Sequence, residues 1–260
     1  MTADPPRAIG TPAAPPLGLR LASAAASAHP ASTPRTIGWR FPALPPALAD
    51  AVATEWGLTI VEDAAEIDPR SLPAFAALHA HARSEQVVRA LARRTNLVLP
   101  AASALVIGDG PVAATIATTL GRGGTRVVRA VGDPVVRLRA ELAGIRNVPS
   151  GAPWPAADLV IVSGEGHPPL APTALSGVVI DASSDASGVQ DAAGENVRPG
   201  VRHVHAQTWA VESPGPYENG NAASAHPTRI ADLLIALSIL RASTAGAADA
   251  DTLLAGLVLA

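Results

Sequence analysis

The sequence predicts an α/β protein: a doubly wound parallel sheet with a reduced N-terminal α/β segment and C-terminal helices. Short apolar, β-branched runs begin at residues 104, 125, 157 and 177, and helical patterns separate the first three of them. A glycine-containing turn follows the first run. Uniformly apolar strands that alternate with helices are typical of a parallel sheet covered on both faces.

The N-terminal part begins with a segment that is expected to lack a core. Residues 1–37 are rich in Ala, Pro, Ser, Thr and Gly, with few large apolar side chains, and we expect a disordered tail. Scattered Arg residues in this acid-poor stretch leave a targeting role open. Order is expected to begin near Trp39 and Phe41. The patterns that follow predict a helix over 48–56, a strand over 57–63 and one long or two short helices over 71–94.

The C-terminal part continues the sheet and ends in helices. A fifth strand is predicted over 201–211, and a turn-rich stretch follows it. Two apolar helices are predicted over 228–241 and 249–260.

Composition excludes several classes of function. With 260 residues, the chain can bury a core without disulfides or metals. It has no Cys and no Lys, which excludes thiolate zinc sites, a Cys nucleophile and a Schiff-base lysine. A net charge of −3 without a long basic run indicates no nucleic-acid partner, and no apolar stretch has the length of a membrane span. Without a secretory signal pattern, a cytoplasmic protein is expected, with a small-molecule nucleotide ligand and with assembly into a homo-oligomer left open.

The turn after the first apolar run has the pattern of a dinucleotide-binding loop. Gly108, Gly110 and Ala113 stand where such loops need a tight turn, close approach of the backbone to a diphosphate, and a small residue for helix packing. The amides at the start of the next helix favour an anion. The loop predicts a Rossmann-like dinucleotide-binding domain over 101–212, between an N-terminal segment (38–100) and C-terminal helices (213–260). Its expected cofactor-binding residues are Gly108, Asp109, Gly110, Pro111 and Val112.

The second strand departs from the pattern. The acid that would bind the adenosine ribose is expected at its end, but Val131 stands there. Asp133 follows two residues later, where it could instead begin the next helix. Arg129, if it faces the site, would favour the 2′-phosphate of NADP over NAD. A Rossmann shell with weak or no cofactor affinity is the alternative.

The stretch 87–134 resembles the cofactor domain of adenosylhomocysteinase, through its strand, its glycine loop and the Asp133–Pro134 pair. Further along, "ADLVIVSGEGH" resembles the family's fourth strand and Thr-Gly turn, which places Ser163 and Gly164 at the cofactor. The resemblance also implies Asp63 and His226 as substrate-binding residues, from the acidic stretch 60–67 and from "AHPTRIADLLIA". It implies a bound NAD and a nucleoside substrate.

The positions that carry the family's chemistry are replaced. Ala76 and Leu78 stand for its Lys and Asp, Arg83 for its Cys, and Ser183 or Ser184 for a His. Loss of one proton-transfer group typically slows a reaction about 100- to 10,000-fold, so no catalytic residues are assigned and no hydrolase activity is expected. The expected function is therefore an adenosylhomocysteinase-like binding protein. The alternative is an NADP-dependent oxidoreductase that uses Asp63 or His226 as base.

Other polar groups are weaker candidates. His203 and His205 lie on one face of a predicted strand, but without a third ligand in view no metal site is predicted. Glu62, Asp63 and Glu66 are expected at a solvated strand end. Loop residues that follow the strand at 177 are expected to contact a ligand; they are Asp181, Ser183, Ser184 and Asp185.

Overall fold

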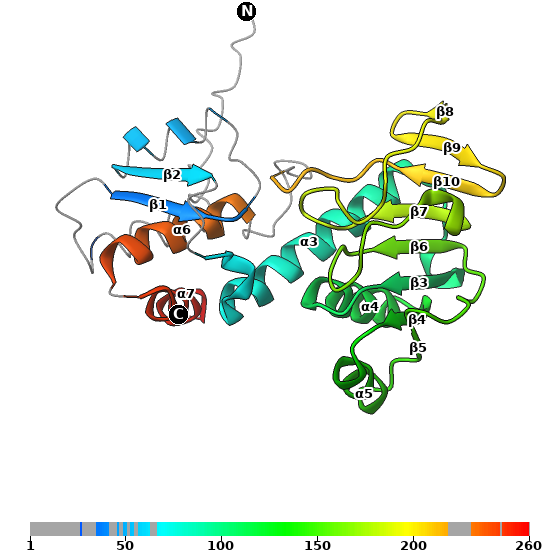
Figure 1. Ribbon diagram of the computed structural model, residues 1–260, viewed down its shortest axis with the longest axis horizontal. Helices are drawn as coiled ribbons and strands as arrows, with labels where there is room; N and C mark the ends of the chain where they lie inside the picture. The colour runs from blue at the N-terminus through cyan, green and yellow to red at the C-terminus, as the bar shows by residue number, and fades with distance from the viewer. Residues whose placement is uncertain are drawn as a thin grey trace, which may run out of the picture.

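The computed structural model describes residues 35–41, 57–62, 67–217, 230–244 and 246–259, with Ser27, Pro46, Ala49, Asp50, Ala53 and Thr54. These residues form two lobes joined by one long helix (Figure 1). Of the helix expected over 48–56, only the four residues Ala49, Asp50, Ala53 and Thr54 fall within this part, and they are helical.

The larger lobe is built on an eight-stranded sheet whose parallel part has the order β5-β4-β3-β6-β7-β10. In order of connection this is 3-2-1-4-5-6, the strand order of doubly wound nucleotide-binding folds. Two antiparallel strands, β9 and β8, extend one edge. The bounds are β3 Ser103–Ile107, β4 Arg126–Val131, β5 Asn147–Pro149, β6 Leu159–Val162, β7 Gly177–Asp181, β8 Glu195–Arg198, β9 Val201–His205 and β10 Thr208–Val211. The predicted Rossmann-like α/β class is confirmed.

Helices cover one face of this sheet more completely than the other. On the first face, α3 (Pro73–Arg94) and α4 (Pro111–Arg122) pack on Val106, Ile161 and Ile180. On the second face, α5 (Pro134–Leu142) packs beside β4 and β5, and much of the remaining cover comes from loop side chains such as Trp154, Leu170 and Val189. The central strands β3 and β6 are buried by both layers, which explains their uniformly apolar sequences.

Two details of the sheet differ from the sequence-based expectation. The strand predicted over 201–211 is a hairpin, because the chain turns at Ala206 and Gln207, where Ala206 has a φ of +34°. The short strand β5 was not predicted; its polar and proline-containing sequence has no strand pattern. Neither feature interrupts the pairing of β6 with β3 or with β7 at the centre of the sheet.

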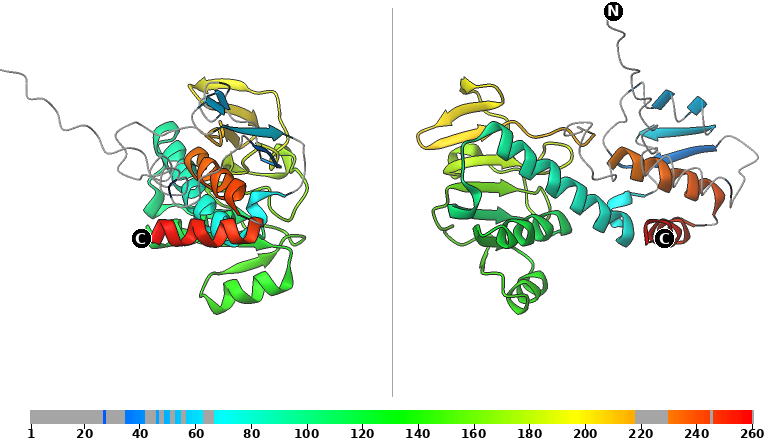
Figure 2. Two further views of the ribbon diagram at one scale, coloured as in Figure 1. Left: turned by 90° about the vertical axis from the view of Figure 1, so that its left-hand side faces the viewer. Right: turned by 180° about the vertical axis from the view of Figure 1, so that it is seen from behind.

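One continuous helix, α3, serves both lobes (Figure 2). Near its start, Phe75 and Ala82 are buried in the core of the smaller lobe. Towards its end, Val87 and Leu91 are buried against the sheet lobe. The region 71–94 therefore contains one long helix rather than two short ones.

The smaller lobe combines segments from both ends of the chain. A parallel pair, β1 (Arg35–Trp39) and β2 (Leu58–Glu62), lies beside α6 (Ile230–Ser243), and α7 (Ala247–Leu259) packs on α6 and α3. The side chains of Leu233, Leu234 and Leu237 on α6 are buried in its core. The segments 38–100 and 213–260 thus share one core, and β1 begins at Arg35, inside the stretch expected to be a tail. Within the described part of the chain, no helix combines the length and apolar character that crossing a membrane requires.

A buried carboxylate fastens α7 to the beginning of α3. Asp251 accepts hydrogen bonds from the backbone N–H groups of Ala74 and Phe75, both at 2.8 Å. The residue before α3 is Leu72, whose side chain offers no cap of its own. Asp251 therefore supplies the anion that the N-terminus of α3 favours.

We predict that Asp251→Ala lowers the free energy of unfolding by about 2 kcal/mol, because two N–H groups lose their acceptor. Urea denaturation measures the loss. Asp249→Ala, exposed in the first turn of the same helix, is the matched control and should lower stability by less than about 1 kcal/mol, the usual contribution of an exposed first-turn carboxylate. Equal effects of the two substitutions would contradict the role given to Asp251.

Candidate functional site

The candidate site lies at the carboxyl ends of β3 and β6, where the strand order reverses. In open parallel sheets this is where ligands bind. The loop after β3 turns at Gly108, whose φ is +145°. A Cβ atom at Gly108 would lie 2.0 Å from Oγ of Ser163, so a side chain here would collide with the turn after β6. The Cβ atom of Ala113, in the first turn of α4, would be 3.2 Å from the same added atom, which agrees with the need for a small residue there.

The amides at the start of α4 hold an anion that belongs to this chain. The carboxylate of Glu165 accepts hydrogen bonds from the N–H groups of Val112 at 3.2 Å and Ala113 at 3.0 Å. Gly110 leaves the space for it, because a Cβ atom there would lie 2.2 Å from Cδ of Glu165. Burial raises the pKa of Glu165 above its usual value, and the two backbone hydrogen bonds, the Ser163 side chain and the charge of Arg129 offset only part of that rise. The N–H groups of Val112 and Ala113 thus form the anion-binding cradle that the glycine loop predicts, and the side chain of Glu165 occupies it.

Arg129 lies beneath this loop and is 2% exposed. Its Nη2 donates to the carbonyl oxygen of Gly108 at 2.9 Å, and its Nε has no hydrogen-bond partner among the described residues. Burial lowers the pKa of Arg129, and the charges of Glu165 and Asp109 oppose that shift. The buried guanidinium therefore adds positive potential under the anion cradle and is not exposed for a ligand's 2′-phosphate.

The end of β4 also departs from a standard ribose site. Val131 is fully buried. Asp133 caps α5, because its carboxylate accepts from the N–H groups of Val135 and Val136. The acid at this edge is Asp109 from the glycine loop, whose two oxygens accept from Gly132 N–H at 2.7 Å and Asp133 N–H at 3.1 Å.

The turn after β6 completes the candidate site. Ser163 is buried at the end of the strand, and Gly164 and Gly166 on either side of Glu165 have φ values of +74° and +77°. The N–H group of Asp109 donates to the carbonyl oxygen of Glu165 at 3.0 Å, which joins this turn to the glycine loop.

Of the cofactor-binding residues expected from the sequence, the structure places Val131 in the core and brings the others together. They are Gly108, Asp109, Gly110, Pro111, Val112, Arg129, Ser163 and Gly164. Asp63 and His226, expected at the substrate, lie outside the described residues. Sequence reasoning missed Glu165, although an acid directly after the Ser163–Gly164 pair was a signal that this turn carries its own charge.

A second polar cluster lies where α3 passes the end of β7. His79 is 3% exposed, and its Nε2 lies 2.8 Å from Oγ of Ser184. Burial, with smaller contributions from Arg83 and Arg70, lowers the pKa of His79 to about 3. An imidazole that stays neutral to such low pH is a weak base, so the pair indicates packing between α3 and β7 rather than a catalytic dyad.

Arg83 occupies a neighbouring structural position. Its guanidinium is fully buried and donates to the carbonyl oxygens of Ala182, Ser183 and Pro214 at 2.7–2.9 Å. These bonds join α3 to the end of β7 and to the chain after β10. Nearby, Asp181 accepts from Ser183 and Val189, and Asp185 accepts from Ser187. Of the residues that were expected to contact a ligand, Asp181, Ser183 and Asp185 therefore hold the loop itself, whereas Ser184 contacts α3 through His79.

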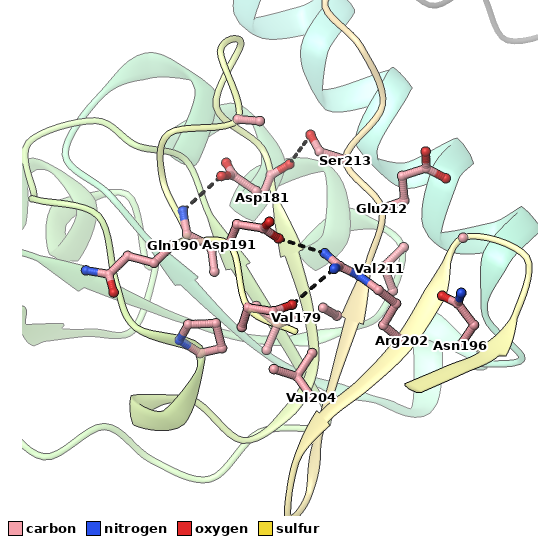
Figure 3. Close-up of a pocket in the computed structure, with 16 residues that line it drawn as sticks. Val179, Asp181, Gln190, Asp191, Asn196, Arg202, Val204, Val211, Glu212 and Ser213 are labelled. Atoms are coloured by element: carbon pink, nitrogen blue, oxygen red, sulfur yellow. Dashed lines mark hydrogen bonds and ion pairs between the residues drawn. The ribbon is translucent and has the colours of Figure 1, made fainter. Parts of the chain in front are cut away.

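A cavity of about 600 Å³ opens between this loop and the β9–β10 hairpin (Figure 3). Its volume is typical of small-molecule sites. However, Arg202 at its rim is held by Asp191 Oδ1 at 3.1 Å and the Ala192 carbonyl at 3.0 Å, and Glu212 pairs with Arg94 at 3.6 Å. Its charged rim groups are already engaged, so the cavity shows no preference for a class of ligand.

The histidine pair on β9 is not part of a metal cluster in the described part of the chain. His203 lies against the Trp209 ring with centroids 5.7 Å apart, and its Nε2 lies 3.0 Å from the Ala206 carbonyl oxygen. His205 is exposed at the end of the strand.

The strand order and the glycine loop define a Rossmann-type α/β protein. Neither protein-family models nor curated proteins gave a match to the sequence. Among solved structures, the chain is similar to the dipicolinate synthase A chain from Bacillus subtilis (16% identity, TM-score 0.43, covering 59% of this chain and 51% of that one). It is also similar to an L-alanine dehydrogenase (18%, 0.49, 86% and 70%) and to a transhydrogenase from Sinorhizobium meliloti (17%, 0.45, 82% and 62%). The chain spans about half the length of the dipicolinate synthase chains it matches.

The buried, neutral state of His79 makes stability depend on pH. Its pKa is about 3 in the folded protein and near 6.5 when unfolded. Between these values the unfolded chain binds more protons, so the free energy of unfolding falls as pH falls, by at most about 1.4 kcal/mol per pH unit from this group.

We predict that His79→Gln makes this decline shallower in urea denaturation over a series of pH values below 6.5. His81→Gln, at an exposed position on the same helix, should retain the steepness of the native protein. The same slope in all three proteins would show that His79 is not the buried group responsible.

Proposed function

We propose that this protein is a Rossmann-type binding module for a nicotinamide dinucleotide or an adenosine-type ligand, without hydrolase activity. The observation that carries the proposal is the glycine loop, whose amides at Val112 and Ala113 already hold a carboxylate. A diphosphate presents the same kind of acceptor oxygens to such a helix terminus.

The carboxylate of Asp109, which lies against the end of β4, supports NAD or adenosine over NADP as the ligand. Asp109 uses one lone pair on each oxygen for the amides of Gly132 and Asp133, so each oxygen can accept a further hydrogen bond from a ribose hydroxyl. A 2′-phosphate would instead meet this carboxylate as a like charge. Arg129 is buried and bonded to Gly108, so the NADP-dependent oxidoreductase gains no support from it.

The proposal includes descent from an adenosylhomocysteinase-like ancestor that has lost its chemistry. The family's Lys and Asp positions hold Ala76 and Leu78 on α3, which have no group that transfers protons. The Cys position holds Arg83, whose guanidinium binds backbone carbonyls. Of the two serines near the position of a family His, Ser183 bonds to Asp181 and Ser184 lies against the neutral imidazole of His79. These contacts support retention of the fold with loss of the catalytic groups.

We expect calorimetric titration to show NAD binding at least about tenfold more tightly than NADP, because the 2′-phosphate would lie beside Asp109. Asp109→Asn should bring the two affinities closer together while NAD still binds. The matched control is Asp133→Asn, which keeps its position at the helix terminus and should retain the preference. A preference for NADP in the native protein would contradict this assignment.

A second prediction concerns the reaction itself. Purified protein supplied with NAD and adenosylhomocysteine should release no homocysteine in a thiol assay, because α3 supplies none of the family's proton-transfer groups. Thiol release above a protein-free control would overturn the binding-module proposal.

A further inference from the structure

The carboxylate of Glu165 occupies the place that the proposed function gives to the ligand's diphosphate. It accepts from the N–H groups of Val112 and Ala113, and it fills the space left by Gly110. In a dinucleotide complex these donors would face phosphate oxygens. The side chain and a ligand phosphate cannot use the same two donors at the same time.

We propose that Glu165 is an autoinhibitory side chain, a built-in anion that a nucleotide phosphate must displace from the start of α4. The inference rests on the proposed function and adds its regulation. Only molecules whose cradle is open can bind a nucleotide. The apparent association constant is then the constant of the open cradle multiplied by the fraction of molecules in which Glu165 has left it.

The surroundings show a site tuned for an anion rather than a helix end with an incidental cap. Directly beneath the loop, Arg129 is 2% exposed and its Nε has no partner among the described residues. This buried cation favours whichever anion occupies the cradle. The charged groups that act on Glu165 are Arg129 from β4 and, at longer range, Arg70 from the 3₁₀ helix Pro69–Ser71.

Opening requires only the side chain to move. The backbone at Glu165 is held through its carbonyl oxygen by the N–H group of Asp109 at 3.0 Å. The carboxylate is at the far end of a flexible side chain, held by the N–H groups of Val112 and Ala113 and by the neighbouring side chain of Ser163. Rotation about its side-chain bonds frees the helix terminus while the turn that shapes the site stays in place.

The decisive experiment compares NAD affinity, by calorimetric titration near neutral pH, in native protein, Glu165→Gln and Glu165→Ala. Loss of the charged acceptor should tighten binding at least about tenfold in Glu165→Ala, with a smaller gain in Glu165→Gln, whose amide oxygen can still accept from the cradle. Glu141→Gln, exposed on α5, is the matched control and should bind NAD as native protein does.

Amide NMR spectra provide a readout that does not depend on ligand. The signals of Val112 and Ala113 should shift in Glu165→Gln without NAD, and native protein should show further shifts of the same signals when NAD is added. Unchanged signals in the variant would overturn the contact and the proposal with it.

The outcomes separate this inference from the function on which it rests. Equal NAD affinity in native protein and both Glu165 variants would overturn the autoinhibitory role and leave nucleotide binding intact. Binding of NAD, NADP and adenosine by none of the proteins would overturn the proposed function itself. Equal tightening in Glu141→Gln would show an effect of net charge and would also overturn the autoinhibitory role.

Discussion

The contact between the Glu165 carboxylate and the first amides of α4 is the interaction on which the functional account depends. A helix terminus presents N–H groups that need an acceptor, and its dipole favours negative charge. Here the helix has no side-chain cap of its own, since Gly110 stands at that position. The acceptor comes from the turn after the neighbouring strand β6, so the fold supplies both the anion site and its first occupant.

This arrangement links three loops that are distant in sequence. Glu165 follows β6, Asp109 follows β3, and the amides that Asp109 holds lie at the end of β4. Arg129 compensates part of the negative charge from below. The candidate site is therefore a balanced set of charges at the switch point of the sheet, and an entering phosphate must take the place of one member of that set.

The second lobe follows from a different constraint, the need to bury a helix that extends beyond the sheet. The first half of α3 extends beyond the larger lobe and carries the apolar side chain of Phe75. Residues of α6 and α7 bury this side chain in the core of the smaller lobe. Asp251 then caps the helix start across 176 positions of sequence. The lobe needs both ends of the chain because a pair of short parallel strands cannot bury this surface alone.

Local sequence patterns predicted the central strands and the glycine loop, because burial on both faces demands apolar runs and the tight turn demands Gly108. They did not predict the contacts that decide how the site is used. Nothing near Val112 indicates that residue 165 will reach its amide, since that meeting is set by the pairing of β3 with β6. The turn at Ala206 was missed for a local reason, because it lacks the glycine, asparagine or proline that usually announces a hairpin.

A crystal structure of the protein grown with NAD tests the central claim most directly. The account predicts diphosphate oxygens on the amides of Val112 and Ala113, with the Glu165 carboxylate turned away from α4. A structure in which NAD binds elsewhere while Glu165 keeps both hydrogen bonds would contradict it.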